Sequence, residues 1–92
     1  MDVQHQGDGK KGSFYIEKNG KHEAVMTYVW AGSNKFIIDH TEVNDTLRGK
    51  GAGKQMVVKA VEFAREKGVT ILPLCPFAKS VFEKVTDLRD VL

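Results

Sequence analysis

The sequence predicts one α+β domain with the element order β-β-β-α-β-α, a mixed, mostly antiparallel sheet and two helices. Residues 13–43 alternate between apolar and polar side chains in three stretches, which is the period of half-buried strands. Residues 51–67 repeat apolar side chains at intervals of three and four, which is the period of an amphipathic helix. The short apolar run 69–74 then fits a strand that lies parallel to the third strand and is reached through this helix.

The first two strands are predicted to form a hairpin. Residues 13–18 and 21–30 both alternate, and Asn19-Gly20 joins them. This pair favours the type I′ turn, because both of its residues accept a positive φ. A third strand follows over 36–43, and its polar residues gather near its end. We therefore expect functional side chains at that end of the strand.

The two helices have recognisable ends. Gly68 follows residues 51–67 and fits the left-handed position after a helix. Pro76 fits the first position of the second helix, whose apolar residues recur every four positions and are expected to pack on the sheet: Phe77, Val81 and Val85. The strand 69–74 is almost continuously apolar, so we expect it to be buried on both faces.

Composition narrows the class of protein. The 92 residues include 14 Lys and Arg against 12 Asp and Glu, and the net charge of +2 does not by itself indicate a nucleic acid or an anionic membrane as partner. One cysteine cannot form an internal disulfide, and no cluster of Cys and His has the spacing of a metal site. No stretch approaches the roughly 20 apolar residues of a membrane span. We expect a cytoplasmic protein with a flexible, polar tail over 1–12 and one domain over 13–92.

Residues 48–54, RGKGAGK, are glycine-rich and basic and lie between the third strand and the first helix. Glycines let the backbone approach an anion, the N–H groups at a helix start point toward it, and the basic side chains add charge. The spacing excludes two known phosphate loops. A Walker A loop needs Gly where Arg48 stands and Ser or Thr where Gln55 stands. A dinucleotide fingerprint needs Gly or Ala where Lys54 or Met56 stands.

The spacing Arg48-x-x-Gly51-x-Gly53, after a strand and at a helix start, resembles the pyrophosphate-binding signature of the GNAT superfamily of N-acetyltransferases. That signature has Gln or Arg, then Gly, then Gly or Ala at these places. Two further stretches resemble the minimal YjdJ-type subgroup of GNAT-like proteins: DHTEV at 39–43 and PLCPF at 73–77. The resemblance covers every predicted element. It implies a minimal acyl-CoA N-acyltransferase fold, acetyl-CoA as cosubstrate without a metal, and an amine acceptor, either a small molecule or a protein.

In that family the loop and the helix start hold the pyrophosphate of acetyl-CoA, and the pantetheine arm lies where the strands on either side of the helix diverge. The resemblance therefore implies a coenzyme site made of the end of the third strand and the whole loop: Val43, Arg48, Gly49, Lys50, Gly51, Ala52, Gly53 and Lys54. Residues 79–82 of the second helix would border the outer part of the coenzyme.

Three side chains are candidates for the acetyl transfer itself. Cys75 lies at the start of the second helix, where the dipole favours a thiolate and suits proton transfer to the leaving CoA thiolate. It could also accept the acetyl group, or be a small buried apolar side chain. His40 and Glu42 share one face of their strand, whereas Asp39 and Thr41 point the other way. Either His40 or Glu42 could take a proton from the amine, Glu42 could orient His40, or both could be solvated edge residues.

Two other functions remain open. Larger GNAT enzymes carry helices after the first strand and further C-terminal strands that shape the acceptor site, and no segment here is predicted to replace them. They also often place a Tyr on the last helix as general acid, and its counterpart here is Phe82. These differences favour, as an alternative, a noncatalytic module that binds or senses acyl-CoA. A nucleic-acid binder is the third hypothesis, with less support because the basic residues are not interleaved with aromatic ones.

Overall fold

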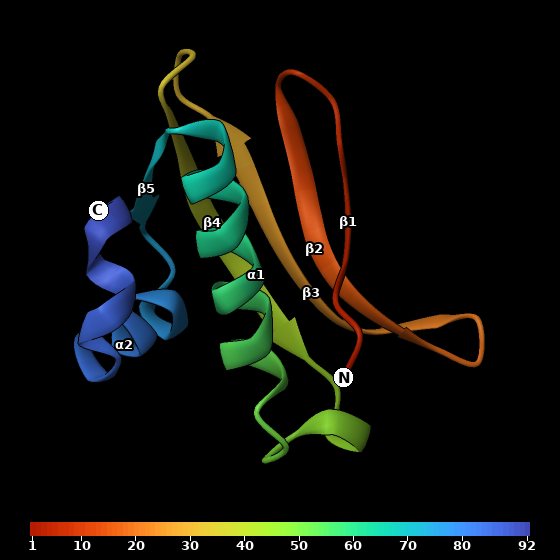
Figure 1. Ribbon diagram of the computed structural model, residues 1–92. Helices are drawn as coiled ribbons and strands as arrows, with labels where there is room; N and C mark the ends of the chain where they lie inside the picture. Colours follow the sequence, from red (N-terminus) through yellow and green to blue (C-terminus); the bar gives the residue numbers. More distant parts are fainter.

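A computed structural model describes all 92 residues and shows one five-stranded sheet with the α-helices packed on one face (Figure 1). The strands lie in the order of the sequence: β1 (Gln4–Gly7), β2 (Lys11–Lys18), β3 (Lys21–Trp30), β4 (Lys35–Val43) and β5 (Thr70–Pro73). Neighbouring strands are antiparallel except β4 and β5, which are parallel. The helices are η1 (Asp45–Leu47), α1 (Ala52–Lys67), α2 (Pro76–Lys84) and η2 (Thr86–Val91), where η marks a 3-10 helix. The prediction of an α+β fold with a mixed, mostly antiparallel sheet is confirmed.

The predicted turn and helix ends are confirmed by the backbone. Asn19 and Gly20 have φ of 55° and 79°, the left-handed values that a type I′ turn requires. Gly68 ends α1, and its N–H bonds to carbonyls of the last helical turn, as expected after a helix. Pro76 is the first residue of α2.

The expectation of a flexible tail over residues 1–12 is corrected by the structure, because β1 pairs with β2 along its whole length. His5 explains the difference. Its ring stacks on Phe14 with centroids 4.3 Å apart and shares a 2.6 Å hydrogen bond with the Tyr28 hydroxyl. Phe63 of α1 meets the same ring edge-on at 4.5 Å. These contacts join residues that are far apart in the sequence, so an alternating pattern cannot indicate them.

The core lies between the sheet and the helices. The face of α1 that meets the strands buries Met56, Val57, Ala60, Val61 and Ala64, and α2 buries Ala78, Val81 and Phe82. Val81 therefore packs as predicted. The prediction is wrong for Phe77, which is 40% exposed because it lies at the rim of a groove. None of the helices is long and apolar enough to cross a membrane.

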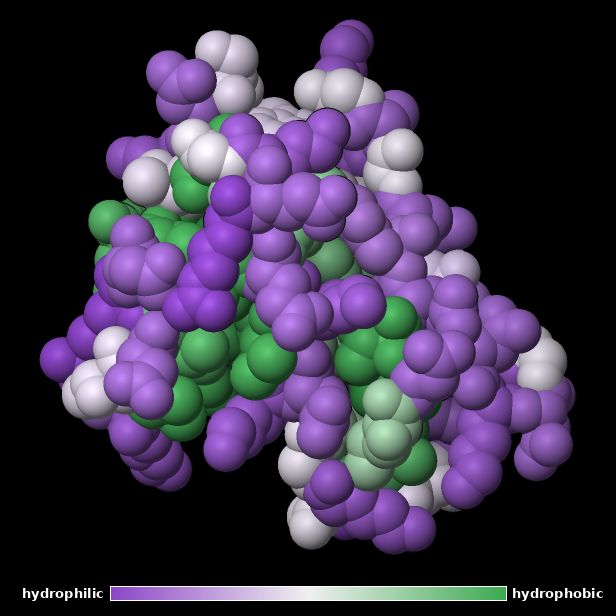
Figure 2. All heavy atoms as spheres, viewed as in Figure 1, coloured by the Kyte–Doolittle hydropathy of each residue, from purple (hydrophilic) through white to green (hydrophobic).

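The other face of the sheet carries no helix (Figure 1). On the edge strand β5, Ile71 faces the helices and is 2% exposed, whereas Leu72 points to the uncovered side and is 40% exposed. The expectation that 69–74 is buried on both faces is therefore wrong. On the helix side, apolar surface gathers over α2 and the C-terminal end (Figure 2). We call the uncovered side the open face; its side chains include Tyr15, Val25, Thr27, Ile37 and Leu72.

Candidate coenzyme and catalytic site

The basic loop leaves backbone donors unused at the start of α1. Gly49 and Gly51 have φ of 78° and 79°, left-handed values that favour glycine. No side chain caps α1, and the first bond into the helix runs from the Gln55 N–H to the Gly51 carbonyl at 3.0 Å. The N–H groups of residues 52–54 therefore have no partner within the protein, and they lie at the positive end of the helix dipole. Such a helix start binds phosphate.

A groove of about 600 Å³ opens at this helix start, between the loop and α2. Its cationic side chains are Arg48 and Lys54 from the loop and Lys84 from α2, and no carboxylate lines it. Arg48 also pairs with Asp45 at 3.3 Å, but both side chains are exposed. Exposed pairs of this kind are weak, so the guanidinium can turn to another anion. The donors and the charge together fit a pyrophosphate.

The structure brings together all the predicted coenzyme residues except Lys50. The loop and strand residues that line the groove are Val43, Arg48, Gly49, Gly51, Ala52, Gly53 and Lys54. Lys50 does not line the groove. Its N–H bonds to the Leu47 carbonyl at 3.2 Å, which closes the turn before the helix. Leu47 and Thr41 also line the groove and were not expected there.

The second helix presents a different set of residues from the one expected. Of residues 79–82, Ser80 and Val81 line the groove, whereas Lys79 and Phe82 line a separate hollow beside β5. Lys84 was missed, although it follows Ser80 by four residues and so lies on the same side of the helix. This spacing is the signal that could have found it.

β4 and β5 diverge beside the groove. Their ladder ends at Ile38, whose carbonyl accepts hydrogen bonds from the N–H groups of both Leu74 and Cys75, at 3.0 and 3.1 Å. Beyond this point the β5 side of β4 has no strand partner, and Val43 lines the groove. An extended ligand can therefore bond to this edge of β4 as an added strand would.

A one-residue bulge in β4 decides which side chains reach the groove. The pairing with β3 shifts by one residue between Ile38 and His40, so Asp39 is the additional residue. Ile38 faces the helices, and His40 and Glu42 face the open side. The expectation that Asp39 points away from His40 is wrong, because Asp39 accepts a 2.6 Å hydrogen bond from the Thr27 hydroxyl on the open face.

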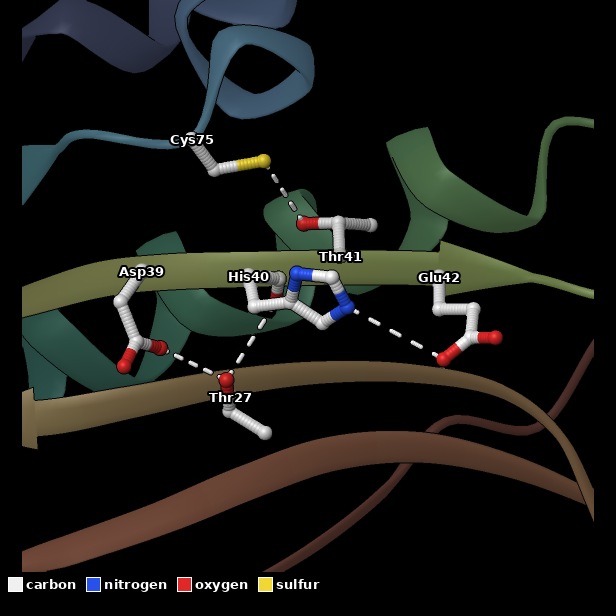
Figure 3. A network of polar contacts seen from close by, with 6 residues as sticks. All are labelled: Thr27, Asp39, His40, Thr41, Glu42 and Cys75. Carbon is white, nitrogen blue, oxygen red and sulfur yellow. Dashed lines mark hydrogen bonds and ion pairs between the residues drawn. The ribbon is translucent and has the colours of Figure 1, made fainter.

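Figure 3 shows the resulting arrangement of the catalytic candidates. His40 Nε2 lies 3.9 Å from Glu42 Oε2, and these side chains are 68% and 71% exposed. Thr41 points the other way, toward Cys75, whose S–H donates to Thr41 Oγ1 at 3.2 Å. Cys75 is 6% exposed. The structure thus keeps the candidates on two sides of β4: Cys75 on the helix side, and His40 with Glu42 on the open side.

The parallel junction, the bulge and the helix start together define the acyl-CoA N-acyltransferase fold. A family model described as GCN5-related N-acetyl-transferase matches residues 13–91. The chain belongs to this family. No group of three or more His, Cys, Asp or Glu side chains is placed to hold a metal ion.

The relatives agree with this assignment. Protein NATD1 from Gallus gallus is 35% identical over 66 residues, which cover 71% of this chain and 60% of that protein. Protein NATD1 from Homo sapiens is also 35% identical, and the matched residues cover 71% of this chain and 57% of that protein. The chain thus spans less than two thirds of the length of these relatives. A GCN5-like protein from Staphylococcus aureus has a structure with a TM-score of 0.75 and 37% identity, covering 98% of this chain and 85% of that one. The aminoglycoside N-acetyltransferase AAC(6')-Iy, at 14% identity and a TM-score of 0.61, shares the fold over 85% of this chain and 67% of its own.

Proposed function

We propose that this protein binds acetyl-CoA in the groove and transfers the acetyl group to an amine. The observation that carries the proposal is the start of α1, where the N–H groups of residues 52–54 have no partner and three cationic side chains meet without a carboxylate. AAC(6')-Iy, which shares the fold, has been determined in complex with CoA and with a bisubstrate analogue. This supports a coenzyme and an amine acceptor for the present chain as well.

The coenzyme would lie along the groove with its pyrophosphate at the start of α1. Arg48, Lys54 and Lys84 would pair with its phosphates, because they are the cations that line the groove. The pantetheine amides would bond to the unpaired edge of β4 near Val43. The acetyl end would then lie just beyond Ile38, where β4 and β5 diverge.

The transfer needs a neutral amine, a stabilised oxyanion and a proton for the departing thiolate. The amine nitrogen attacks the thioester carbonyl carbon, and the new C–N bond forms as the C–S bond breaks. Glu42 or His40 takes the amine proton, directly or through water, and backbone N–H groups of β4 stabilise the negative charge on the oxygen. Cys75 gives its proton to the CoA thiolate and regains one from solvent.

A noncatalytic acyl-CoA binding module is the second candidate function. Phe82, the counterpart of the general-acid Tyr of larger family members, is buried and lines the hollow beside β5 instead of the groove. His40 and Glu42 lie on the open face, and both of their side chains are largely exposed to solvent. Both observations fit binding without turnover.

A calorimetric titration with acetyl-CoA tests the coenzyme site. We expect binding by the parent and a loss of about tenfold or more in affinity for Lys54→Glu, because a charge-assisted phosphate contact becomes a repulsion. Lys59→Glu, on an exposed part of the same helix outside the groove, makes the same charge change and serves as the control.

Release of CoA in the presence of a panel of amines then separates the two candidates. Turnover with any amine supports the acetyltransferase. Tight binding with no turnover across small amines and lysine peptides supports the binding module. No binding by the folded parent overturns both.

A further inference from the structure

Glu23 is the only charged residue that is buried, at 7% exposure, and no catalytic or coenzyme role assigned above uses it. It lies in β3 where the pairing with β2 shifts by one residue, and its side chain reaches the loop that follows β4. The Thr46 hydroxyl donates to Glu23 Oε2, and the Asn44 side-chain amide donates to Glu23 Oε1 at 3.3 Å. The Asn44 N–H also donates to the Glu23 carbonyl at 2.8 Å. One residue therefore holds both ends of a short segment.

The segment held in this way leads into the anion-binding loop. Asn44 directly precedes η1 and Thr46 is its middle residue. Leu47, the last residue of η1, is buried and lines the groove. The Leu47 carbonyl accepts the N–H of Lys50 at 3.2 Å. The hydrogen bonds therefore run from β3 through η1 to Lys50, which precedes the start of α1 at Ala52 by two residues.

A carboxylate suits this position better than a neutral side chain. A buried carboxylate is costly unless hydrogen bonds satisfy it, and here both oxygens accept bonds from the loop. Glutamine has one acceptor oxygen and one NH₂ group, so it cannot accept both bonds. The loop itself is polar and contains two positive-φ glycines, so it needs an external anchor to hold one shape.

We propose that Glu23 is a positioning residue that holds η1 so that Arg48 and the N–H groups at the start of α1 are set for the coenzyme before it binds. This inference rests on the proposed coenzyme site. It assigns Glu23 no contact with the coenzyme, because Glu23 does not line the groove.

The pKa of the Glu23 carboxyl is lowered mainly by the Thr46 hydrogen bond, with smaller help from Asn44 and from lysines of the hairpin, and this outweighs its desolvation. The carboxylate form is therefore the one that holds the loop, and its hold is lost as the pH falls through the lowered pKa. The other titratable groups near it are Lys18, Lys21, His22 and Glu42.

The test compares Glu23→Gln and Thr46→Val with a matched control. We expect each variant to weaken acetyl-CoA binding by about fivefold or more, since each loses one hydrogen bond of the anchor, under conditions where denaturant curves show that the protein is folded. The double variant should lose less affinity than the product of the two single fold-changes, because the two residues share one hydrogen bond. Glu17→Gln removes an exposed carboxylate, paired with His22 at 3.3 Å, and should leave the affinity within about twofold.

Amide hydrogen exchange of the free protein is a second test, which measures the order of the loop without acetyl-CoA. In Glu23→Gln we expect faster exchange over residues 44–54 while the core strands keep their protection. Lowering the pH should weaken binding more in the parent than in Glu23→Gln. Unchanged affinity and unchanged exchange in a folded Glu23→Gln would overturn the inference. If the parent itself binds no acetyl-CoA, the proposed function fails, and the exchange measurement still decides whether Glu23 orders the loop.

Discussion

The ring of Phe77 lies so close to Gly53 that a Cβ added to this glycine would overlap the ring. Gly53 is the last glycine of the sequence pattern that indicated the anion site, and its N–H is one of the unpaired donors at the start of α1. The contact shows a second reason for glycine at this position, because it sets how closely α2 approaches α1 beside the groove.

Replacing Gly53 with Ala is expected to displace the half-exposed Phe77 ring. Overpacking of this kind costs about 1 kcal/mol of stability where a side chain can rotate away. In a Phe77→Ala background the same change should be neutral or stabilising, because Ala favours a helix more than Gly does. Denaturant unfolding of the four proteins measures this coupling. Equal effects of Gly53→Ala with and without the ring would show that the contact is not responsible.

Gly12 lies beneath the Tyr28 ring at the pairing of β1 with β2. A Cβ there would be 2.5 Å from Tyr28 Oη and 2.6 Å from the Gln6 carbonyl oxygen. Neither group can move away from an added Cβ easily, because Tyr28 is buried and Gln6 belongs to a paired strand. We expect Gly12→Ala to lower the free energy of unfolding by about 2 kcal/mol or more. Gly9→Ala, where an added Cβ meets nothing within 4 Å, should cost less than about 0.5 kcal/mol in the same urea titration.

The pKa of His5 is lowered, chiefly by burial of the ring and further by the charge of Lys67. The folded protein therefore favours neutral His5, and the unfolded chain takes up the proton first as the pH falls below about 6.5. Stability from this group is complete above that pH and is lost as the pH falls through the lowered value. Unfolding free energies of the parent and His5→Phe, measured between pH 8 and pH 5, should diverge with the parent falling further. Lys67→Met should reduce that divergence, and parallel curves for the parent and His5→Phe would contradict the prediction.

Cys75 can be separated from coenzyme binding because its side chain does not line the groove. If it is the general acid, Cys75→Ala lowers kcat and leaves the affinity for acetyl-CoA nearly unchanged. Cys75→Ser, which can still donate to Thr41, should also have a low kcat, because a hydroxyl is a much weaker acid than a thiol. CoA release measured at saturating acetyl-CoA tests this. A kcat equal to that of the parent in Cys75→Ala would assign the thiol to packing alone.

The strands and α-helices from residue 13 onward were predictable because their signals are local, whereas η1 and η2 were not predicted. Period-two alternation, Asn19-Gly20 and Pro76 each act within a few residues of where they stand. β1 was not predictable, because His5 is held by Phe14 and Tyr28, which lie on other strands. The glycine-rich basic loop was predictable for the same reason as the turn, whereas the hydrogen bond from Thr46 to Glu23 joins residues more than twenty positions apart.

The side of the sheet on which the catalytic candidates lie could not be predicted from the alternation of polar and apolar residues. Counting from the buried Ile38 by twos would place His40 and Glu42 under the helices, and the structure places them on the opposite side. A bulge leaves no distinct mark in the order of polar and apolar residues, so it has to be seen in the pairing of the strands.

The same bulge lets the end of β4 tolerate the loss of one residue without exchanging its two faces. A substitution at Asp39 alters one side chain. Deleting Asp39 would remove the bulge and restore uninterrupted alternation from Ile38 onward, with His40 and Glu42 still on the open side and Thr41 and Val43 still on the helix side. A related sequence that is one residue shorter between Ile38 and His40 would therefore present the same side chains to the groove, although its residue spacing differs.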